Sequence, residues 1–205
     1  MKKGILLCIL LLLTVLLAGS ADAYPARAVK FFPVLKEEHR AAWPESDIGV
    51  LASQVAHESA WREAARRVEK SGVVSYGLLQ VLDVTLKDMQ KRHASLRGIE
   101  PVQMLQARWG IRAGIFYDRE MWRLCFFAAD ETERYAMMLA AYNGGYGWLL
   151  RDRKLAEQKG HDKNRWFGHV ELFSQRSREA FRINRRYPAS ILEHAEEYRR
   201  ALRGI

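Results

Sequence analysis

Apolar residues recur every three or four positions along most of the chain beyond residue 23, and runs of alternating β-branched residues are few. This repeat is typical of helices that bury one face. In residues 47–61, for example, Leu51, Val55 and Glu58 fall on one face when each residue turns the helix by about 100°. The sequence therefore predicts a mostly α protein with short connections.

The same pattern sets the expected ends of the first elements. Ser46 and Asp47 can cap the first core helix, because their side-chain oxygens accept from free backbone N–H groups. That helix is expected to stop within residues 61–67. Residues 70–77 hold two glycines and are expected to form a loop or a short hairpin. A short helix is expected from about residue 78 to residue 93.

Further helices are expected in the second half of the chain. One opens at Pro101 and continues to about residue 123, and another starts at Glu131 and ends or kinks at Asn143-Gly144-Gly145. Residues 151–169 are polar and basic, so they are expected to form a surface excursion. A last amphipathic helix is expected after Pro188 and should help to close the core.

The first 23 residues have the layout of a secretory signal. Lys2 and Lys3 come first, an apolar stretch covers residues 5–17, and small side chains at 21–23 suit a cleavage site. An uncleaved anchor is the alternative, but the apolar run is shorter than the ~20 residues that a spanning helix needs. We therefore expect a periplasmic or secreted protein with no stable membrane span, in which residues 24–205 form a single domain.

The charge of the chain bears on its partners. Its formal net charge is +9, which suits an acidic polymer such as a cell wall. Nucleic acid is a rival partner, but export and the mixing of basic with acidic residues argue against it. Cys125 is the only cysteine after residue 23, so we expect no intramolecular disulfide and an apolar packing role for this side chain.

Glu58 is the leading candidate for chemistry. Its place on the apolar face points the carboxyl inward, and partial burial raises the pKa of a carboxyl group. A carboxylic acid that stays protonated can donate a proton to a leaving group. The alternative is a helix-end glutamate that is solvated or paired. His161 and His169 lack ligand spacing, so we expect no metal and no cofactor.

Several motifs occur together in one order along the chain. They are Glu58-Ser59, Tyr76-Gly77-Leu78-Leu79-Gln80 and Ala140-Ala141-Tyr142-Asn143-Gly144-Gly145, with a helix-like segment at 110–117 between the last two. In this combination residues 43–150 resemble the soluble-type lytic transglycosylases, a bacterial family with a lysozyme-like fold. Gly110 stands where that family has asparagine. The resemblance implies a lysozyme-like multi-helix domain, with residues 151–205 as a helical extension.

The resemblance also implies a reaction. Glu58 would be the single catalytic acid and base, cutting the bond between N-acetylmuramic acid (MurNAc) and N-acetylglucosamine (GlcNAc) in peptidoglycan. Attack by the muramyl 6-hydroxyl would leave a 1,6-anhydro sugar. Tyr142 would donate a hydrogen bond to the Glu58 carboxylate and fix its rotamer.

Further residues are candidates for sugar binding, because they offer amide groups, aromatic faces or close backbone approach. They are Ser59, Tyr76, Gly77, Gln80, Asn143 and Tyr146. For some of them a structural role is an alternative. Ser59 can pack the loop of the acid, and Asn143 can cap the end of its helix. We explain Gly77 by close approach of backbone and glycan.

Three other functions are open. A goose-type-like lysozyme would use the same acid to direct water. A non-catalytic cell-wall-binding subunit of an envelope-spanning machine would keep the fold without turnover, and a secretion or conjugation apparatus is a candidate partner. A nucleic-acid-binding protein is supported only by the net charge. The sequence does not distinguish cleavage at strand ends from cleavage inside strands.

Overall fold

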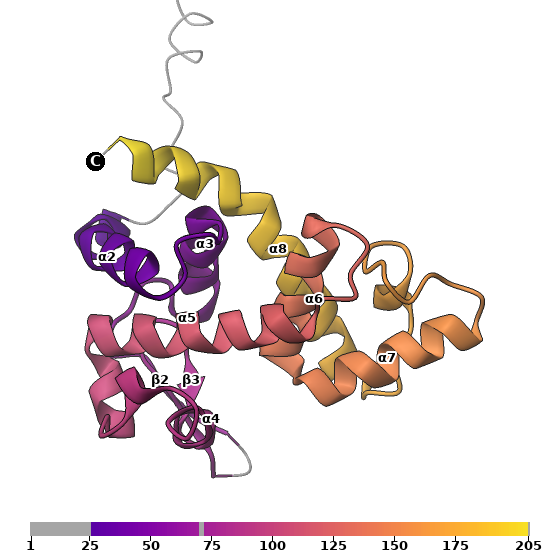
Figure 1. The fold of residues 1–205 in the computed structure, drawn as a ribbon, viewed down its shortest axis with the longest axis horizontal. Helices are drawn as coiled ribbons and strands as arrows, with labels where there is room; N and C mark the ends of the chain where they lie inside the picture. The colour runs from indigo at the N-terminus through magenta and orange to yellow at the C-terminus, as the bar shows by residue number, and fades with distance from the viewer. Residues whose placement is uncertain (1–25, 70–71, 205) are drawn as a thin grey trace, which may run out of the picture.

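The computed structural model describes residues 26–69 and 72–204 (Figure 1). They form a mostly helical fold with one small sheet, so the prediction of a lysozyme-like multi-helix domain is confirmed. The predicted signal segment lies outside the described residues. Within the described ranges, no helix combines the length and the apolar character needed to cross a membrane.

The elements follow one another with short connections. In chain order they are η1 (Ala26–Phe31), α2 (Phe32–Ala42), α3 (Ile48–Ser59), β1 (Arg66–Val68), β2 (Val74–Tyr76), β3 (Val81–Leu82), α4 (Asp83–Met89), η2 (Ala94–Leu96), η3 (Pro101–Leu105), α5 (Ala107–Leu124), α6 (Glu131–Gly144), α7 (Tyr146–Gln158), η4 (Val170–Leu172) and α8 (Arg178–Arg203). The elements labelled η are 3₁₀ helices.

The start of α3 is capped by one of the two predicted residues. The Asp47 carboxylate accepts from the Gly49 N–H at 2.8 Å. The Ser46 hydroxyl instead donates to the Trp43 carbonyl at 2.9 Å. The helix ends at Ser59, slightly earlier than predicted, because Ala60 has a left-handed backbone with φ of 49°.

The hairpin expected near residues 70–77 is confirmed. Strands β1 and β2 pair in antiparallel fashion, and β3 adds to β2, giving the order β1-β2-β3. The helix expected to start at Leu78 starts instead at Asp83. The reason is the intervening turn, in which Gly77 and Gln80 both have positive φ, and the short strand β3 that follows.

The helix predicted to run from Pro101 is divided. Residues Pro101–Leu105 form the 3₁₀ helix η3, and Gln106 adopts an extended backbone before α5 begins at Ala107. The Glu63 carboxylate accepts from the Ala107 N–H at 2.7 Å and so satisfies a free donor at the start of α5. The next helix, α6, begins at Glu131 and ends at Gly144, as predicted.

The segment 151–169, predicted to form a surface excursion, lies largely at the surface but is more ordered and better anchored than that prediction implied. The helix α7 covers much of this segment, and Trp166 is fully buried. The Glu133 carboxylate explains how this polar segment is held, because it accepts from the backbone N–H groups of Trp166, at 2.6 Å, and Phe167, at 3.2 Å. The sequence pattern did not show this long-range anchor.

The last helix is longer than predicted. It begins at Arg178, where the Ser177 hydroxyl accepts from the Ala180 N–H, and it contains Pro188 instead of starting there. Proline has no N–H to donate within a helix, so it commonly bends one. Figure 1 shows α8 bent near its middle. The predicted apolar stripe is confirmed, since Ile191 and Leu202 at its two ends are buried.

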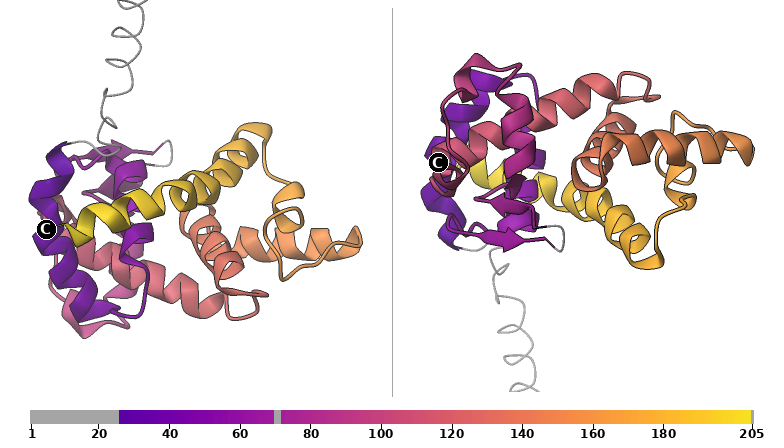
Figure 2. Two further views of the ribbon diagram at one scale, coloured as in Figure 1. Left: turned by 90° about the horizontal axis from the view of Figure 1, so that it is seen from above. Right: turned by 90° about the horizontal axis from the view of Figure 1, so that it is seen from below.

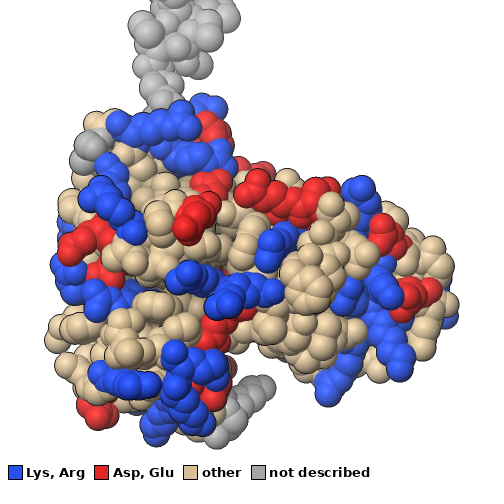
Figure 3. Space-filling view, viewed as in Figure 1, with Lys and Arg blue, Asp and Glu red and all other residues tan. Residues whose placement is uncertain are grey.

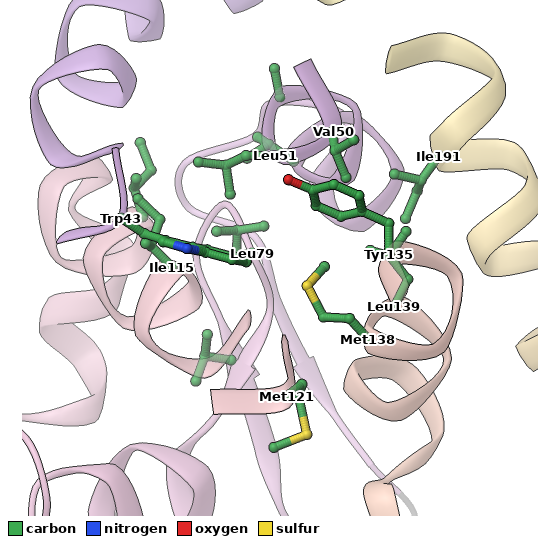
Figure 4. Close-up of a cluster of buried hydrophobic side chains, with 14 of the residues drawn as sticks. Trp43, Val50, Leu51, Leu79, Ile115, Met121, Tyr135, Met138, Leu139 and Ile191 are labelled. Carbon is green, nitrogen blue, oxygen red and sulfur yellow. The ribbon is translucent and has the colours of Figure 1, made fainter. Parts of the chain in front are cut away.

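The core joins helices that are far apart in sequence. Figure 4 shows residues of α3, α5, α6 and α8 meeting around Met138 and Tyr135. The Tyr135 hydroxyl accepts from the Asp47 N–H at 2.7 Å, which ties α6 to the start of α3. In Figures 1 and 2, α5 and α8 each connect the part that holds α3 and the sheet with the part that holds α6 and α7, and they run in opposite chain directions. The end of α3 lies where these parts meet.

Candidate active site

Glu58 lies in the last turn of α3 and is half-buried. The chain turns sharply after it, because Ala60 and Trp61 both have positive φ, 49° and 60°. Trp61 is 1% exposed, and its indole N–H donates to the Tyr198 hydroxyl at 3.1 Å. This buried tryptophan anchors the turn and so holds the end of α3, with Glu58, in a defined position.

The nearest partner of Glu58 comes from α8. The Tyr187 hydroxyl donates to Glu58 Oε1 at 2.5 Å. Burial raises the pKa of Glu58 to about 7, although the hydrogen bond from Tyr187 and the charge of Arg67 lower it. Near neutral pH this carboxyl group can therefore both donate and accept a proton.

The hydrogen bond expected from Tyr142 to Glu58 is not present. The Tyr142 hydroxyl donates to the Leu79 carbonyl at 2.6 Å, which ties α6 to the loop before β3. Its ring lies nearly parallel to the Tyr187 ring, with centroids 6.5 Å apart. Tyr142 thus supports the tyrosine that contacts the acid. The prediction was wrong because α8, rather than α6, brings a phenol onto Glu58.

A sequence signal for Tyr187 was available. It lies four positions before Ile191, so it continues the apolar stripe of α8 toward the N-terminus of that helix. The last helix was predicted to start after Pro188, so its predicted apolar stripe did not include Tyr187. Tyr187 is 2% exposed, in agreement with its place on the buried face.

A second acid is buried behind Glu58. Asp118 of α5 is 2% exposed, and its Oδ1 accepts from Gln54 Nε2 of α3 at 3.1 Å. Burial raises the pKa of Asp118 well above its usual range, the Gln54 hydrogen bond lowers it, and the charge of Glu58 raises it further. A neutral Asp118 carries an O–H group that can donate a hydrogen bond. The buried Gln54 Oε1 is an acceptor that has no such donor.

Glu58 opens onto a hollow of about 890 Å³, which we call the acid hollow. Gln80 and Trp61 line it together with basic side chains from η1 and from the segment after α3. A second hollow, of about 770 Å³, lies between α4 and α5 and includes Tyr117. The Tyr117 ring lies 4.9 Å from the Tyr142 ring, so a row of tyrosines joins the second hollow to Glu58.

Figure 3 shows the charges and the shape of one face. Basic and acidic side chains are interspersed over most of it, as they are along the sequence. The surface is hollowed between the part that carries α4 and the part that carries α7. This face therefore has the concave form that a chain-like ligand needs.

Gln80 lies on the wall of the acid hollow, but its amide is engaged in the protein. Nε2 donates to the carbonyl oxygens of Ala65, at 3.0 Å, and Gly77, at 2.8 Å. Oε1 accepts from the Ser75 hydroxyl at 2.9 Å. Gln80 therefore fixes the loop beside the acid. Tyr76, on β2, lies with its ring under the guanidinium of Arg66, which also lines the hollow.

Two of the predicted contacts with sugar are corrected. The Ser59 hydroxyl is buried and donates to the Val55 carbonyl at 3.1 Å, so it faces its own helix. Gly77 has φ of 74°, and a Cβ there would lie 1.9 Å from the Met104 carbonyl oxygen. The close approach that requires this glycine is therefore to the backbone of the protein, not to a glycan. Gly110 is explained in the same way, because its Cβ would lie 2.5 Å from that oxygen.

The remaining predicted residues lie outside the acid hollow. Asn143 is exposed, and its Oδ1 accepts from Asn184 Nδ2 at 3.2 Å. The Tyr146 hydroxyl donates to the Leu124 carbonyl at 3.2 Å. Neither hydrogen bond reaches Glu58. Of the predicted site residues, the structure thus brings Glu58 and Gln80 to one hollow.

Across residues 26–69 and 72–204, no three histidine, cysteine or acidic side chains cluster in a way that could hold a metal ion. Cys125 is buried, and burial raises the pKa of its thiol to about 12, so this sulfur stays protonated. The reactive group that the described residues offer at the acid hollow is the carboxyl of Glu58.

The fold and the site define a class: a lysozyme-like helical protein with a half-buried glutamate beside a hollow of about 890 Å³. Two curated relatives are similar to most of the chain. The membrane-bound lytic murein transglycosylase F 1 of Alkalilimnicola ehrlichii is 31% identical over 159 residues, which is 76% of this chain and 28% of the relative. The membrane-bound lytic murein transglycosylase F of Stutzerimonas stutzeri is 28% identical over 161 residues, 78% of this chain and 29% of the relative.

These comparisons support a relationship with lytic murein transglycosylases at modest identity. The chain spans less than a third of the length of either relative. No protein-family profile matches the chain.

Proposed function

We propose that this protein is a peptidoglycan lytic transglycosylase. It cleaves the glycosidic bond between MurNAc and GlcNAc and leaves 1,6-anhydro-MurNAc ends. The observation that carries the proposal is the contact between Glu58 and Tyr187, which combines a carboxyl of pKa about 7 with a fixed orientation. The names of both relatives support the choice of murein as substrate.

In the proposed reaction, Glu58 first acts as the acid. Because Oε1 accepts from Tyr187, the transferable proton belongs on Oε2. It passes to the glycosidic oxygen as the bond from that oxygen to the muramyl C1 breaks, so GlcNAc leaves with a hydroxyl group. The acetamido group of the substrate stabilises the positive charge that develops at C1.

Glu58 then acts as the base. The muramyl 6-hydroxyl attacks C1, and its proton returns to the Glu58 carboxylate, which restores the starting enzyme. No water is consumed, and no second carboxylate is needed. Intramolecular attack is favoured because the nucleophile is already held close to C1. A pKa near neutrality suits a group that must serve both steps.

The site of action is part of the proposal. We propose that the protein acts on peptidoglycan outside the cytoplasm, after export directed by the predicted signal. The names of the relatives include the term membrane-bound, but they mention no secretion or conjugation partner, and we propose none.

Mass spectrometry of digested peptidoglycan tests the proposal. The expected products carry anhydro ends, each one water lighter than a reducing end. Exclusive formation of reducing ends would overturn the proposal in favour of a lysozyme that directs water. Absence of any product from a folded protein would support a non-catalytic cell-wall-binding role instead.

A further inference from the structure

The acid hollow has an uneven charge. Its basic side chains are Arg27, Lys30, Arg62, Arg66 and Arg67, and its acidic side chains are Glu58 and Glu63. Glu63 is already engaged, because its carboxylate accepts from the Ala107 N–H at the start of α5. The pKa of Glu58 is raised to about 7, so near neutral pH only part of this carboxyl group is ionised. The hollow therefore presents positive charge to whatever lies against Glu58.

These basic side chains come from two segments. Arg27 and Lys30 belong to η1 and are three positions apart. Side chains at i and i+3 of a 3₁₀ helix eclipse one another, so both lie on the same side of η1. The others belong to the segment that runs from the end of α3 into β1. The hollow thus has basic groups on two structural elements.

Few of these charges are neutralised by an acidic side chain, and Arg62 donates to the Ser59 carbonyl at 3.0 Å. Among the described residues, Arg67 is the one of the five that forms an ion pair, with Glu69 at 2.7 Å. The Arg66 guanidinium lies over the Tyr76 ring, and the Lys30 ammonium over the Phe31 ring. Arg27 and Lys30 are both exposed. Their charges remain available to a ligand that carries carboxylates.

We propose that the acid hollow binds carboxylates attached to the lactyl arm of MurNAc. This inference rests on the proposed function. A glycan of GlcNAc alone is uncharged, whereas the muramyl sugar carries either a free lactyl carboxylate or a stem peptide with its own carboxylates. Guanidinium groups pair with carboxylates through two parallel hydrogen bonds, which gives such recognition both strength and direction.

The proposed contacts involve exposed groups, which sets their expected strength. Exposed ion pairs are individually weak and are screened by salt. Removal of two of the basic charges is expected to weaken binding by about two- to thirtyfold at low salt. The loss is expected to shrink as the salt concentration rises.

Binding can be measured without turnover in the full chain carrying Glu58→Gln. This parent is compared with a form that also carries Arg27→Gln and Lys30→Gln. The matched control carries Lys154→Gln and Lys159→Gln, which remove the same charge from exposed positions of the α7 region, away from the acid hollow. The ligands are solubilised strands with intact stem peptides, strands stripped by an amidase, and uncharged oligomers of GlcNAc.

The expected result is weaker binding of muramyl strands by the Arg27 and Lys30 variant only, with unchanged binding of the GlcNAc oligomers. A loss on intact strands alone identifies the carboxylates of the stem peptide, and a loss on stripped strands alone identifies the free lactyl carboxylate. A loss on both kinds of strand shows that the site accepts either carboxylate. Equal losses on all three ligands, or equal losses in the matched control, would overturn the inference.

The inference can fail separately from the proposed function. If the wild-type protein produces anhydro ends but the Arg27 and Lys30 variant binds strands as the parent does, only the carboxylate site is rejected. If the parent binds no strand and the wild-type protein produces no anhydro ends, the proposed function is overturned, and this inference with it.

Discussion

The Tyr187 hydroxyl lies 2.5 Å from Oε1 of Glu58, although 129 positions separate the two residues in the chain. The contact joins the end of α3 to the middle of α8, one residue before Pro188. It has two effects on the acid. It fixes the carboxyl group in one orientation, and it favours the ionised form, which partly offsets the effect of burial on the pKa.

Replacement of this phenol tests both effects. In Tyr187→Phe the hydrogen bond to Oε1 is lost. The pKa of Glu58 is therefore expected to rise above its wild-type value of about 7. The pH at which kcat/KM falls on the alkaline side should shift upward, and loss of orientation should lower kcat by about ten- to a hundredfold. The measurement is the pH profile of peptidoglycan cleavage. A profile that matches the wild type would show that Tyr187 does not act through Glu58.

Tyr142→Phe should have a smaller effect on activity. It leaves the Leu79 carbonyl without its donor, which we expect to cost about 1–2 kcal/mol of unfolding free energy. The ring and its stacking on Tyr187 remain. Urea unfolding and cleavage rates measured side by side check this expectation. If Tyr142→Phe loses more activity than Tyr187→Phe, Tyr142 is the residue that positions the acid.

The neutral state of Asp118 can be tested by stability. Its folded-state pKa is raised, so its contribution to stability is present below the unfolded pKa and is lost as the pH rises toward the folded value. Asp118→Asn mimics the neutral acid and keeps a donor for Gln54. Because the amide does not titrate, the variant does not lose stability as the pH rises. Relative to wild type, the variant should therefore become more stable as the pH is raised from about 4 to 7.

Asp118→Ala is the contrasting change. It leaves the Gln54 amide buried without its acceptor and should cost about 1–3 kcal/mol near pH 4. This cost should shrink as the pH rises, because this variant also lacks the titrating carboxyl group. Urea unfolding of both variants across this pH range is the measurement. A stability difference between Asp118→Asn and wild type that does not depend on pH would mean that Asp118 ionises normally in the folded protein.

The explanation of Gly77 predicts a loss of stability. In Gly77→Ala the new Cβ meets the Met104 carbonyl oxygen and the backbone keeps a positive φ, so the loss should exceed about 2 kcal/mol. Gly160→Ala is the matched control, because φ is also positive there but no atom lies near the added Cβ. It should cost about 1 kcal/mol. Equal losses in thermal unfolding would remove the steric explanation.

Local patterns predicted much of the fold. The stripe of α3, the glycines near the hairpin and the glycines after Asn143 each act within a few residues, so the sequence alone placed these elements. The start predicted for the last helix, after Pro188, was wrong for a physical reason. Proline usually marks a helix end, whereas here Ser177 caps a helix that continues through it.

The candidate site was predicted less completely than the fold. Glu58 could be proposed as a candidate because its neighbours and its helix face are local features. The choice between Tyr142 and Tyr187 as its partner depends on how α8 packs across α3, which no local spacing encodes. The pairing of Gln54 with Asp118 is hidden for the same reason, because two polar side chains on separate helices do not reveal that they meet.

The most direct test of the central claim is the cleavage of purified peptidoglycan by the wild-type protein and by Glu58→Gln, with the anhydro products quantified by mass spectrometry. The amide fills nearly the same volume but cannot donate the proton, so anhydro products should fall by about two to four orders of magnitude. Urea unfolding should confirm that the variant remains folded. If Glu58→Gln released anhydro products at the wild-type rate, the assignment of Glu58 as the acid would be contradicted.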